Sequence, residues 1–207
     1  MATPFTLSQH WTFNLMDDPK RLAFVMARYQ FVVDMCTPNS SVIELGCSEG
    51  IGLPLLLEKA DRYTGVDIDG PALEFARKNW PDPRFTFLED DVLGKQFGTF
   101  DCVFSLDVVE HIEQAREHLF FEAVHQNTAE TGIAVVGTPN LSAEAYQSES
   151  SRIGHINLFS AKRLKACLQT YFHHVFLFGM NDELVHTGYH NMCHYLIALA
   201  CNKKVHS

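Results

Sequence analysis

One short stretch, "VIELGCSEGIG" from Val42 to Gly52, constrains the fold of this chain more than any other. An apolar run typical of a buried strand ends at a glycine-rich loop, and an apolar segment typical of a helix follows. In α/β folds such a loop lets the backbone approach a nucleotide-like ligand. The same loop also spells G-x-S-x-G, the strand–turn–helix signature of serine hydrolases, with Ser48 as the nucleophile. The rest of the sequence has to distinguish a ligand-binding loop from a hydrolase.

Hydrophobic periodicity predicts strands and helices that alternate along the chain. Strands are expected over 41–45, 62–68, 84–90, 100–106, 132–138, 173–180 and 193–201, and helices over 19–36, 51–60, 71–80, 112–127 and 161–172. The last two strands have no helix between them, so one of them should run antiparallel to the others. The pattern predicts an α/β fold, with a Rossmann-like seven-stranded, mostly parallel sheet, one antiparallel edge strand and helices on both faces.

Composition and charge exclude several classes of protein. Hydrophobic residues make up 46% of the chain and charged residues 20%, which is typical of a folded globular domain. The net charge of −9 disfavours a nucleic-acid partner, because no basic cluster could neutralise phosphates. No apolar stretch reaches the ~18 residues of a membrane span, and the N-terminus lacks a signal-peptide pattern. We therefore expect a cytoplasmic protein with no membrane partner, whose six cysteines are free thiols.

The position of the glycine loop argues against the hydrolase. A hydrolase nucleophile normally follows several strands and an oxyanion loop, whereas only one helix is expected before Val42. The interpretation as a ligand-binding loop makes a further prediction, since a nucleotide-like ligand lies across the carboxyl ends of the first strands in an open parallel sheet. An acidic residue that ends the second strand can accept the hydroxyls of a ribose, and Asp67 stands there. The loop does not spell G-x-G-x-x-G, which disfavours a dinucleotide.

Four motifs between about Ser41 and Gly137, in order, resemble those of the class I S-adenosylmethionine-dependent methyltransferases. They are "VIELGCSEG", "YTGVDID", "FLEDDV" and "FDCVFSLDVVEHI". The resemblance implies S-adenosylmethionine as cofactor, with Ser48 at a position where the family often has glycine. It also implies a set of cofactor-binding residues: Glu44, Gly46, Cys47, Ser48 and Gly50 around the amino-acid part, Asp67 on the ribose with Ile68 against the adenine, Asp91 and Val92 at the adenine edge, and Leu106 near the cofactor.

The predicted domain covers the whole chain, 1–207, and the resemblance divides it into three parts. Residues 1–40 form an N-terminal flap and helix, 41–137 the cofactor-binding core, and 138–207 an acceptor lid and the closing strands. Trp11 and Phe13 are expected either to close over the cofactor or to pack on the edge of the domain.

Two histidines are candidate catalytic residues. Methyl transfer from a sulfonium needs alignment of acceptor and methyl group, and a hydroxyl acceptor must also lose a proton to a nearby base. His111 follows the fourth strand in "DVVEHIE", and His155 lies in "GHINLFS", shortly before a helix with Ser160 as its N-cap. Either could be structural instead, His111 by orienting the next helix and His155 by anchoring the lid.

A divalent metal at Asp107, Glu110 and His111 is an alternative that we do not favour. The stretch "DVVEH" resembles the E-x-x-E-H of ubiquinone-pathway O-methyltransferases, whose side chains are associated with a divalent metal. Aspartate replaces the first glutamate and shortens the reach by one methylene. Oxygen ligands with one imidazole would suit magnesium or zinc.

The expected reaction is S-adenosylmethionine-dependent methyl transfer to a small-molecule acceptor, as O-methylation of a sugar, glycan precursor or related metabolite. The polar segment 140–156, which has no sustained period, is expected to be a surface lid over the acceptor. Asn181, Asp182 and His186 are expected to recognise the acceptor. The alternative is a catalytically inactive, cofactor-binding subunit with a regulatory or scaffolding role. The sequence assigns no oligomeric state.

Overall fold

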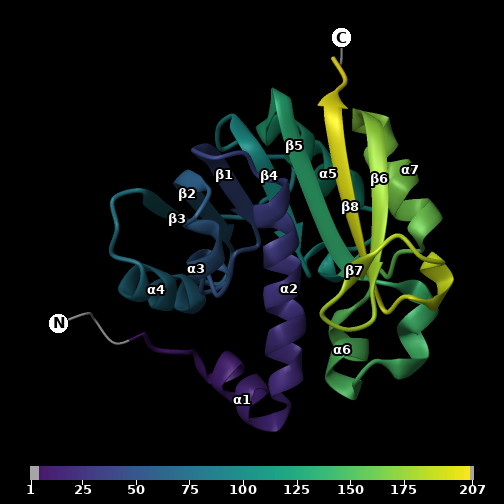
Figure 1. The fold of residues 1–207 in the computed structure, drawn as a ribbon, viewed down its shortest axis with the longest axis horizontal. Coiled ribbons are helices and arrows are strands. Elements are labelled where there is room, and N and C mark those ends of the chain that lie inside the picture. The colour runs from purple at the N-terminus through teal and green to yellow at the C-terminus, as the bar shows by residue number, and fades with distance from the viewer. Residues whose placement is uncertain (1–4, 206–207) are drawn as a thin grey trace.

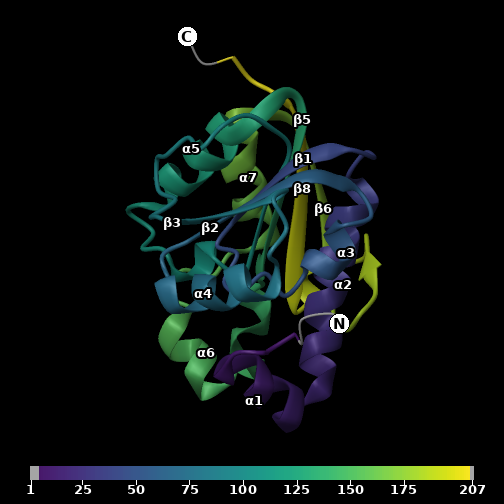
Figure 2. The ribbon, with the colours of Figure 1, turned by 90° about the vertical axis from the view of Figure 1, so that its left-hand side faces the viewer.

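The computed structural model describes residues 5–205, which form one eight-stranded sheet with helices against both faces (Figures 1 and 2). The strands are β1 Ser40–Leu45, β2 Ala60–Asp67, β3 Phe85–Glu89, β4 Phe100–Leu106, β5 Thr128–Pro139, β6 Phe172–Met180, β7 Val185–His186 and β8 Tyr195–Lys203. The α-helices are α1 Gln9–Asp17, α2 Pro19–Met35, α3 Leu53–Leu56, α4 Gly70–Asn79, α5 Glu117–Asn127, α6 Glu149–Gly154 and α7 Ala161–Tyr171. Three short 3-10 helices are η1 Val109–His111, η2 Leu141–Tyr146 and η3 His190–Met192.

The strand order is β3-β2-β1-β4-β5-β8-β6-β7, which confirms the α/β fold with a mostly parallel sheet. The first five strands of this order pair in parallel. Strand β8 runs antiparallel between β5 and β6, and the two-residue β7 forms the antiparallel edge. The sheet has eight strands and not seven, because β7 is too short to leave a periodic signal in the sequence.

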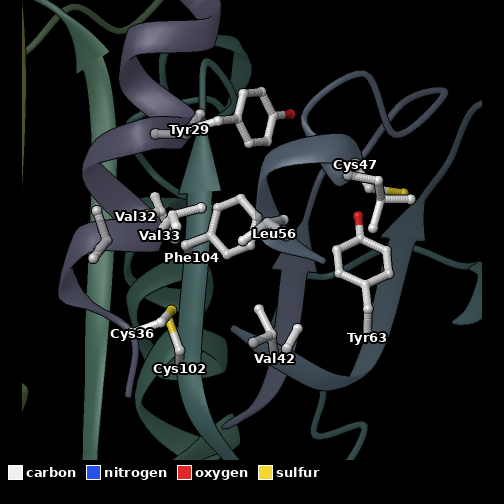
Figure 3. Packing of buried hydrophobic residues seen from close by; sticks show 14 of the residues in the cluster. Tyr29, Val32, Val33, Cys36, Val42, Cys47, Leu56, Tyr63, Cys102 and Phe104 are labelled. Atoms are coloured by element: carbon white, nitrogen blue, oxygen red, sulfur yellow. The ribbon is translucent and has the colours of Figure 1, made fainter. Parts of the chain in front are cut away.

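Two apolar clusters explain why the central strands are almost continuously hydrophobic. Every residue of β1 is buried, as expected for a parallel strand covered on both faces. One cluster joins α2, α3 and α4 to the sheet, and the other joins α5 and α7 to its opposite face. Figure 3 shows part of the first cluster, in which Tyr29 and Val32 of α2 lie near Phe104 of β4.

Two predicted helices are shorter than the sequence pattern suggests. The helix expected over 51–60 reduces to α3, because the chain already enters β2 at Ala60. The helix expected over 112–127 begins only at Glu117, after η1 and a turn. In both cases the apolar residues beyond the helix lie in a loop. Periodicity alone does not distinguish such residues from the apolar face of a helix.

The N-terminal segment and the lid contain helices that were not expected. Helix α1 begins at its N-cap Ser8, and none of its residues is fully buried, so its sequence gives only a weak helical signal. The segment 140–156 contains η2 and α6, with Asn140 and Ser148 as N-caps. Both views place α1 and α6 at the same end of the molecule, which is the end at which the cleft opens (Figures 1 and 2).

All six cysteines are free, as expected. Among residues 5–205 no helix combines the length and the apolar character needed to span a membrane. The cytoplasmic location stays a prediction.

Candidate functional site

A large cleft opens at the carboxyl ends of the parallel strands and has a volume of about 1100 Å³. It lies where β1 and β4 adjoin. At this point the strand order reverses, because β2 and β3 follow on one side of β1 and β4 and β5 on the other. Helices α1 and α2, the lid and the loop before β8 complete its walls. Ligand pockets in proteins usually measure about 300–1,000 Å³, so this cleft has room for a nucleoside cofactor and a small second molecule.

The glycine loop after β1 is held in a conformation that brings its backbone to the cleft. Gly46 has φ +86° and Gly50 φ +70°, both in the left-handed region. A Cβ on Gly46 would lie 2.2 Å from Cγ2 of Val108, so no other residue fits there. Ser48, with φ +48°, also lies in the left-handed region, at the position where the family that the motifs resemble often has glycine. Gly46, Cys47 and Ser48 line the cleft, whereas Gly50 lies behind it and supports the loop.

Asp67 ends β2 with its carboxylate fixed at the floor of the cleft. The backbone N–H of Ser48 donates to Oδ2 at 2.6 Å, and the N–H of Asp69 donates to Oδ1 at 2.9 Å. Each carboxylate oxygen keeps a further lone pair, so Asp67 can still accept two hydroxyl protons from a ribose.

The predicted adenine-side residues also line the cleft. Ile68 is 73% exposed, which leaves a large apolar side chain for the face of an aromatic ring to cover. The carboxylate of Asp91 accepts from the N–H of Leu93 at 3.0 Å and lies 3.6 Å from the guanidinium of Arg116. Val92 is buried beside it. Leu106, at the end of β4, joins this set from the other side of the glycine loop.

Glu44 does not line the cleft but lies buried beneath the glycine loop. The hydroxyl of Tyr29 donates to its Oε1 at 2.6 Å, and the hydroxyl of Tyr63 donates to its Oε2. Burial, with a smaller contribution from nearby Asp67, raises the pKa of Glu44 to about 8 against the lowering effect of the two phenols. Glu44 therefore reaches a bound ligand only through the loop and the hydrogen-bonded tyrosines.

Arg28 of α2 is a cleft residue that the sequence analysis missed. Its Nη1 lies 2.6 Å from Oδ2 of Asp107, and its guanidinium stacks 3.7 Å from the ring centre of Tyr195. Asp107 itself has φ +59°, directly after β4. The Nε of Arg28 and the hydroxyl of Tyr195 are buried without a hydrogen-bond partner among the described residues. A cation within the apolar run of α2 was the available signal, but its ion-pair partner is 79 positions away.

The two candidate catalytic histidines lie together at the lid end of the cleft. The ring centres of His111 and His155 are 5.0 Å apart, and both side chains line the cleft. Nδ1 of His111 lies 2.9 Å from the carbonyl oxygen of Gly154, which makes Nδ1 the protonated nitrogen and leaves a lone pair on Nε2. Partial burial lowers the pKa of His155, and His111 lowers it further.

Glu110 lies behind these histidines and is fully buried. The hydroxyl of Thr138 donates to its Oε2 at 3.0 Å, whereas Oε1 has no partner within the part of the chain that the structure describes. Burial raises the pKa of Glu110 to about 8, with a further contribution from Asp107. One ligand-type atom each from Glu110, His111 and His155 lies within 4.8 Å of the other two.

This cluster fits a divalent metal better than the set implied by the sequence resemblance. The carboxylate of Asp107 is paired with Arg28 and is not one of the three groups that lie together. His155, which comes from the lid, takes its place. The donor set thereby changes from two carboxylates and one imidazole to one carboxylate and two imidazoles.

Of the residues expected to recognise the acceptor, Asn181 and Asp182 line the cleft and His186 does not. His186 lies in β7, and its Nδ1 accepts from the N–H of Gly188 at 3.1 Å. Trp11 lines the cleft, whereas Phe13 is 61% exposed and lies outside it.

The N-terminal segment is fastened over the cleft by a buried carboxylate. Glu49 accepts the N–H of Ser8 at 2.9 Å and its hydroxyl at 2.8 Å. Because Ser8 is also the N-cap of α1, these two bonds set the start of the helix that carries Trp11. They support a flap function for Trp11 but not for Phe13.

Comparison with known proteins is consistent with this geometry. A family described as "Methyltransferase domain" matches residues 16–171. The mitochondrial ubiquinone biosynthesis O-methyltransferase of Schizosaccharomyces pombe is 31% identical over 117 residues, 50% of this chain and 43% of that protein. A probable S-adenosylmethionine-dependent methyltransferase of Mycobacterium tuberculosis is 30% identical over 113 residues, 54% of this chain and 40% of that protein. The chain thus spans less than half the length of these curated relatives.

Solved structures share the fold at low sequence identity. A putative methyltransferase of Haloferax volcanii, solved in complex with a methyltransferase activator, has a TM-score of 0.71 at 13% identity, covering 95% of this chain and 99% of that one. The N-methyltransferase NodS of Bradyrhizobium japonicum, in complex with S-adenosyl-L-homocysteine, has a TM-score of 0.65 at 17% identity, covering 92% and 91%.

Proposed function

Because this chain belongs to the class I S-adenosylmethionine-dependent methyltransferases, we propose that it transfers a methyl group from that cofactor to a hydroxyl of a small polar acceptor. The observation that carries the proposal is a single cleft with cofactor-type residues at one end and a histidine pair beneath a polar lid at the other. When bound, the cofactor supplies a methyl group on a positively charged sulfur.

The residues of the cleft fit the parts of that cofactor. Asp67 has lone pairs left for the ribose hydroxyls, and the exposed Ile68 offers an apolar surface to the adenine. The Arg28–Asp107 pair lies beside the glycine loop, because Val108 packs against Gly46. An amino acid carries one ammonium and one carboxylate, and this pair is its charge complement. We assign Arg28, through its unpartnered Nε, to the carboxylate and Asp107 to the ammonium.

The charges that line the cleft favour a neutral acceptor with several hydroxyls. Each arginine of the lining already has a carboxylate within 4.0 Å: Arg21 with Asp17, Arg28 with Asp107 and Arg116 with Asp91. No lysine belongs to the described lining, so an anionic acceptor would find no unpaired Lys or Arg there. The lid and the loop between β6 and β7 contribute hydroxyl, amide and carboxylate groups instead, from Gln147, Ser151, Asn181 and Asp182. This set supports a sugar, glycan precursor or related metabolite.

The proposed step joins the acceptor oxygen to the methyl carbon while the carbon–sulfur bond breaks and its electron pair stays on sulfur. The acceptor proton passes to an imidazole, for which His111 and His155 are the candidates. General-base catalysis of this kind contributes about 10²–10⁴-fold to rate. Closure of Trp11 and the lid 140–156 would exclude water from this end of the cleft.

The test is a transfer assay with isotopically labelled S-adenosylmethionine and a panel of acceptors, with products located by mass spectrometry. We expect methyl gain on oxygen, with neutral polyhydroxyl compounds preferred over carboxylates, amines and thiols. His155→Ala should lower kcat by about 10²-fold or more while S-adenosylhomocysteine affinity stays within about threefold of the native value. Transfer confined to amines or carboxylates would contradict O-methylation.

The alternative, a catalytically inactive subunit, makes the opposite prediction in the same assay. It predicts cofactor binding without turnover on any acceptor, and equal behaviour of the native chain and His155→Ala. The lid favours the enzyme, because it adds polar groups to the cleft beyond the cofactor-type residues, where an acceptor would lie.

A further inference from the structure

We propose that the rings of Tyr146 and His194 form a subsite of the cleft that binds one pyranose ring by stacking against its C–H face. The inference deepens the proposed function and rests on it, because the stacked sugar would belong to the molecule that receives the methyl group. It adds the ring form of the acceptor and the two residues that select it. An acyclic polyol, which has no such face, would bind this subsite poorly.

The first argument is a pair of aromatic rings left open on the wall of the cleft. The ring centres of Tyr146 and His194 are 5.6 Å apart, and the ring planes are inclined by 38°. Both side chains are exposed and line the cleft, with Tyr146 78% exposed. Two adjacent rings inside a cleft offer a ligand a continuous apolar surface, which a single exposed ring elsewhere on the protein does not.

The second argument is that hydrogen bonds hold the pair in place although its members come from distant segments. Tyr146 ends η2 of the lid, and His194 lies between η3 and β8. The side chain of Asn140, the N-cap of η2, donates to the carbonyl oxygens of His190 and Cys193 at 2.7 and 2.8 Å. The N–H of Asn140 donates to the carbonyl oxygen of His194 at 2.9 Å. The two segments are therefore joined before a ligand arrives, which lowers the entropy cost of binding.

The third argument is the set of polar groups beside the pair. Gln147 follows Tyr146 directly and lines the cleft, and its Nε2 is buried with no hydrogen-bond partner among residues 5–205. Oδ1 of Asn181 accepts from the N–H of His194 at 3.0 Å, which holds the amide of this cleft residue beside the pair. Asp182 adds a carboxylate to the lining. Amide nitrogens can donate to the oxygens of hydroxyl groups, and a carboxylate can accept their protons.

This combination selects a pyranose over other neutral molecules. A pyranose ring carries C–H groups on its faces and hydroxyls around its edge, so it matches an aromatic surface bordered by amides and a carboxylate. A phenol could stack on the same rings but has too few hydroxyls for the polar groups. An acyclic polyol has the hydroxyls without a rigid apolar face.

Saturation-transfer difference NMR tests the subsite on the full chain in the presence of S-adenosylhomocysteine, which carries no methyl group to transfer. The probes are the methyl glycosides of β-D-glucopyranose and β-D-galactopyranose, with sorbitol and catechol for comparison. At least one glycoside should receive about fivefold or more the saturation of sorbitol, concentrated on the C–H protons of one ring face.

Variants separate stacking from other contributions to binding. Tyr146→Ala should lower the saturation of the bound glycoside by at least about fivefold, whereas Tyr146→Phe, which keeps the ring, should stay within about twofold of the native chain. Tyr189→Ala is the matched control and should equal the native chain, because Tyr189 is 68% exposed just before η3 but does not line the cleft. Circular dichroism of each variant separates loss of the subsite from loss of the fold.

Four results would overturn the subsite. They are saturation of neither glycoside by folded native chain, no preference for a glycoside over sorbitol, equal saturation in Tyr146→Ala and the native chain, and equal losses in Tyr146→Phe and Tyr146→Ala. Stronger saturation of catechol than of both glycosides would also overturn it, in favour of an aromatic acceptor. A chain that binds a glycoside through Tyr146 yet methylates no acceptor would contradict the proposed function and leave the subsite in place.

Discussion

Glu44→Gln should change how the stability of this protein depends on pH. Glu44 is buried beneath the glycine loop, and burial raises its pKa from 4.5 to about 8. The folded state therefore binds this proton more tightly than the unfolded state does. The contribution of Glu44 to stability is complete below pH 4.5, declines as pH rises and is lost above pH 8.

The size of the effect follows from the pKa difference. Within that window each pH unit costs the native chain up to about 1.4 kcal/mol through Glu44. Glutamine cannot ionise, so the variant lacks this part of the slope. Near pH 5 the native carboxyl is itself protonated, so glutamine, with one acceptor oxygen and an N–H that can donate to the hydroxyl oxygen of Tyr29 or Tyr63, replaces it closely. The variant should match the native chain near pH 5 and be more stable than it near pH 8.

Urea unfolding at pH 5, 6, 7 and 8, with the same m-value for both proteins, measures the difference directly. The free energy of unfolding of Glu44→Gln relative to the native chain should rise by about 3 to 4 kcal/mol between pH 5 and pH 8. Glu89→Gln, at an exposed position of the edge strand β3, is the matched control for the change of residue type. Parallel curves for Glu44→Gln and the native chain would refute the assignment of a raised pKa to Glu44.

Three further predictions test the walls of the cleft. Gly46→Ala should weaken S-adenosylhomocysteine binding by at least about tenfold, because its Cβ would clash with Val108. Gly94 also has a left-handed φ of +70°, but a Cβ there would meet only one neighbour, at 3.5 Å. Gly94→Ala should therefore cost about 1 kcal/mol of stability and leave the affinity measured by calorimetry unchanged. Arg28→Lys keeps the positive charge but loses the planar guanidinium with its paired N–H donors, so cofactor affinity should fall by about tenfold. Arg84→Lys, at an exposed ion pair, should leave cofactor affinity unchanged. Equal cofactor affinity in the two variants would contradict the assignment of Arg28 to the carboxylate. Ser8→Ala removes both the hydrogen bond from the Ser8 hydroxyl to Glu49 and the N-cap of α1. Stopped-flow measurement of Trp11 fluorescence should therefore show faster cofactor dissociation. An unchanged dissociation rate would mean that α1 does not cover the cofactor.

The sequence predicts the parts of the site that depend on local patterns. The strand–glycine–helix unit and the acidic end of the second strand carry their own signals, since burial on both faces and tight turns restrict residue type. The predicted Gly46, Ser48 and Asp67 accordingly lie together at the cleft. Glu44 was assigned to the cofactor-binding residues from the same motif. Successive side chains of a strand point to opposite faces, however, and the side chain of Glu44 points below the loop to Tyr29 and Tyr63.

The parts that sequence analysis missed depend on contacts between distant residues. Arg28 lies in a helix that reads as core, and its role becomes visible only beside Asp107. His155 and Glu110 were assigned to different roles, because nothing in the sequence indicates that the lid folds back onto η1. The contact that fastens the N-cap of helix α1 to Glu49 was missed for the same reason, since it joins residues 41 positions apart.

Calorimetric titration with S-adenosylmethionine and S-adenosylhomocysteine, on the native chain and on Asp67→Ala, tests the cofactor assignment most directly. Loss of two hydrogen bonds to a charged group should weaken affinity by at least about tenfold. Asp69→Ala, which removes the N-cap of α4 but leaves Asp67 in place, should bind within about threefold of the native affinity. Native binding that collapses only in Asp67→Ala is the predicted result. A folded native chain that binds neither compound would contradict the methyltransferase function.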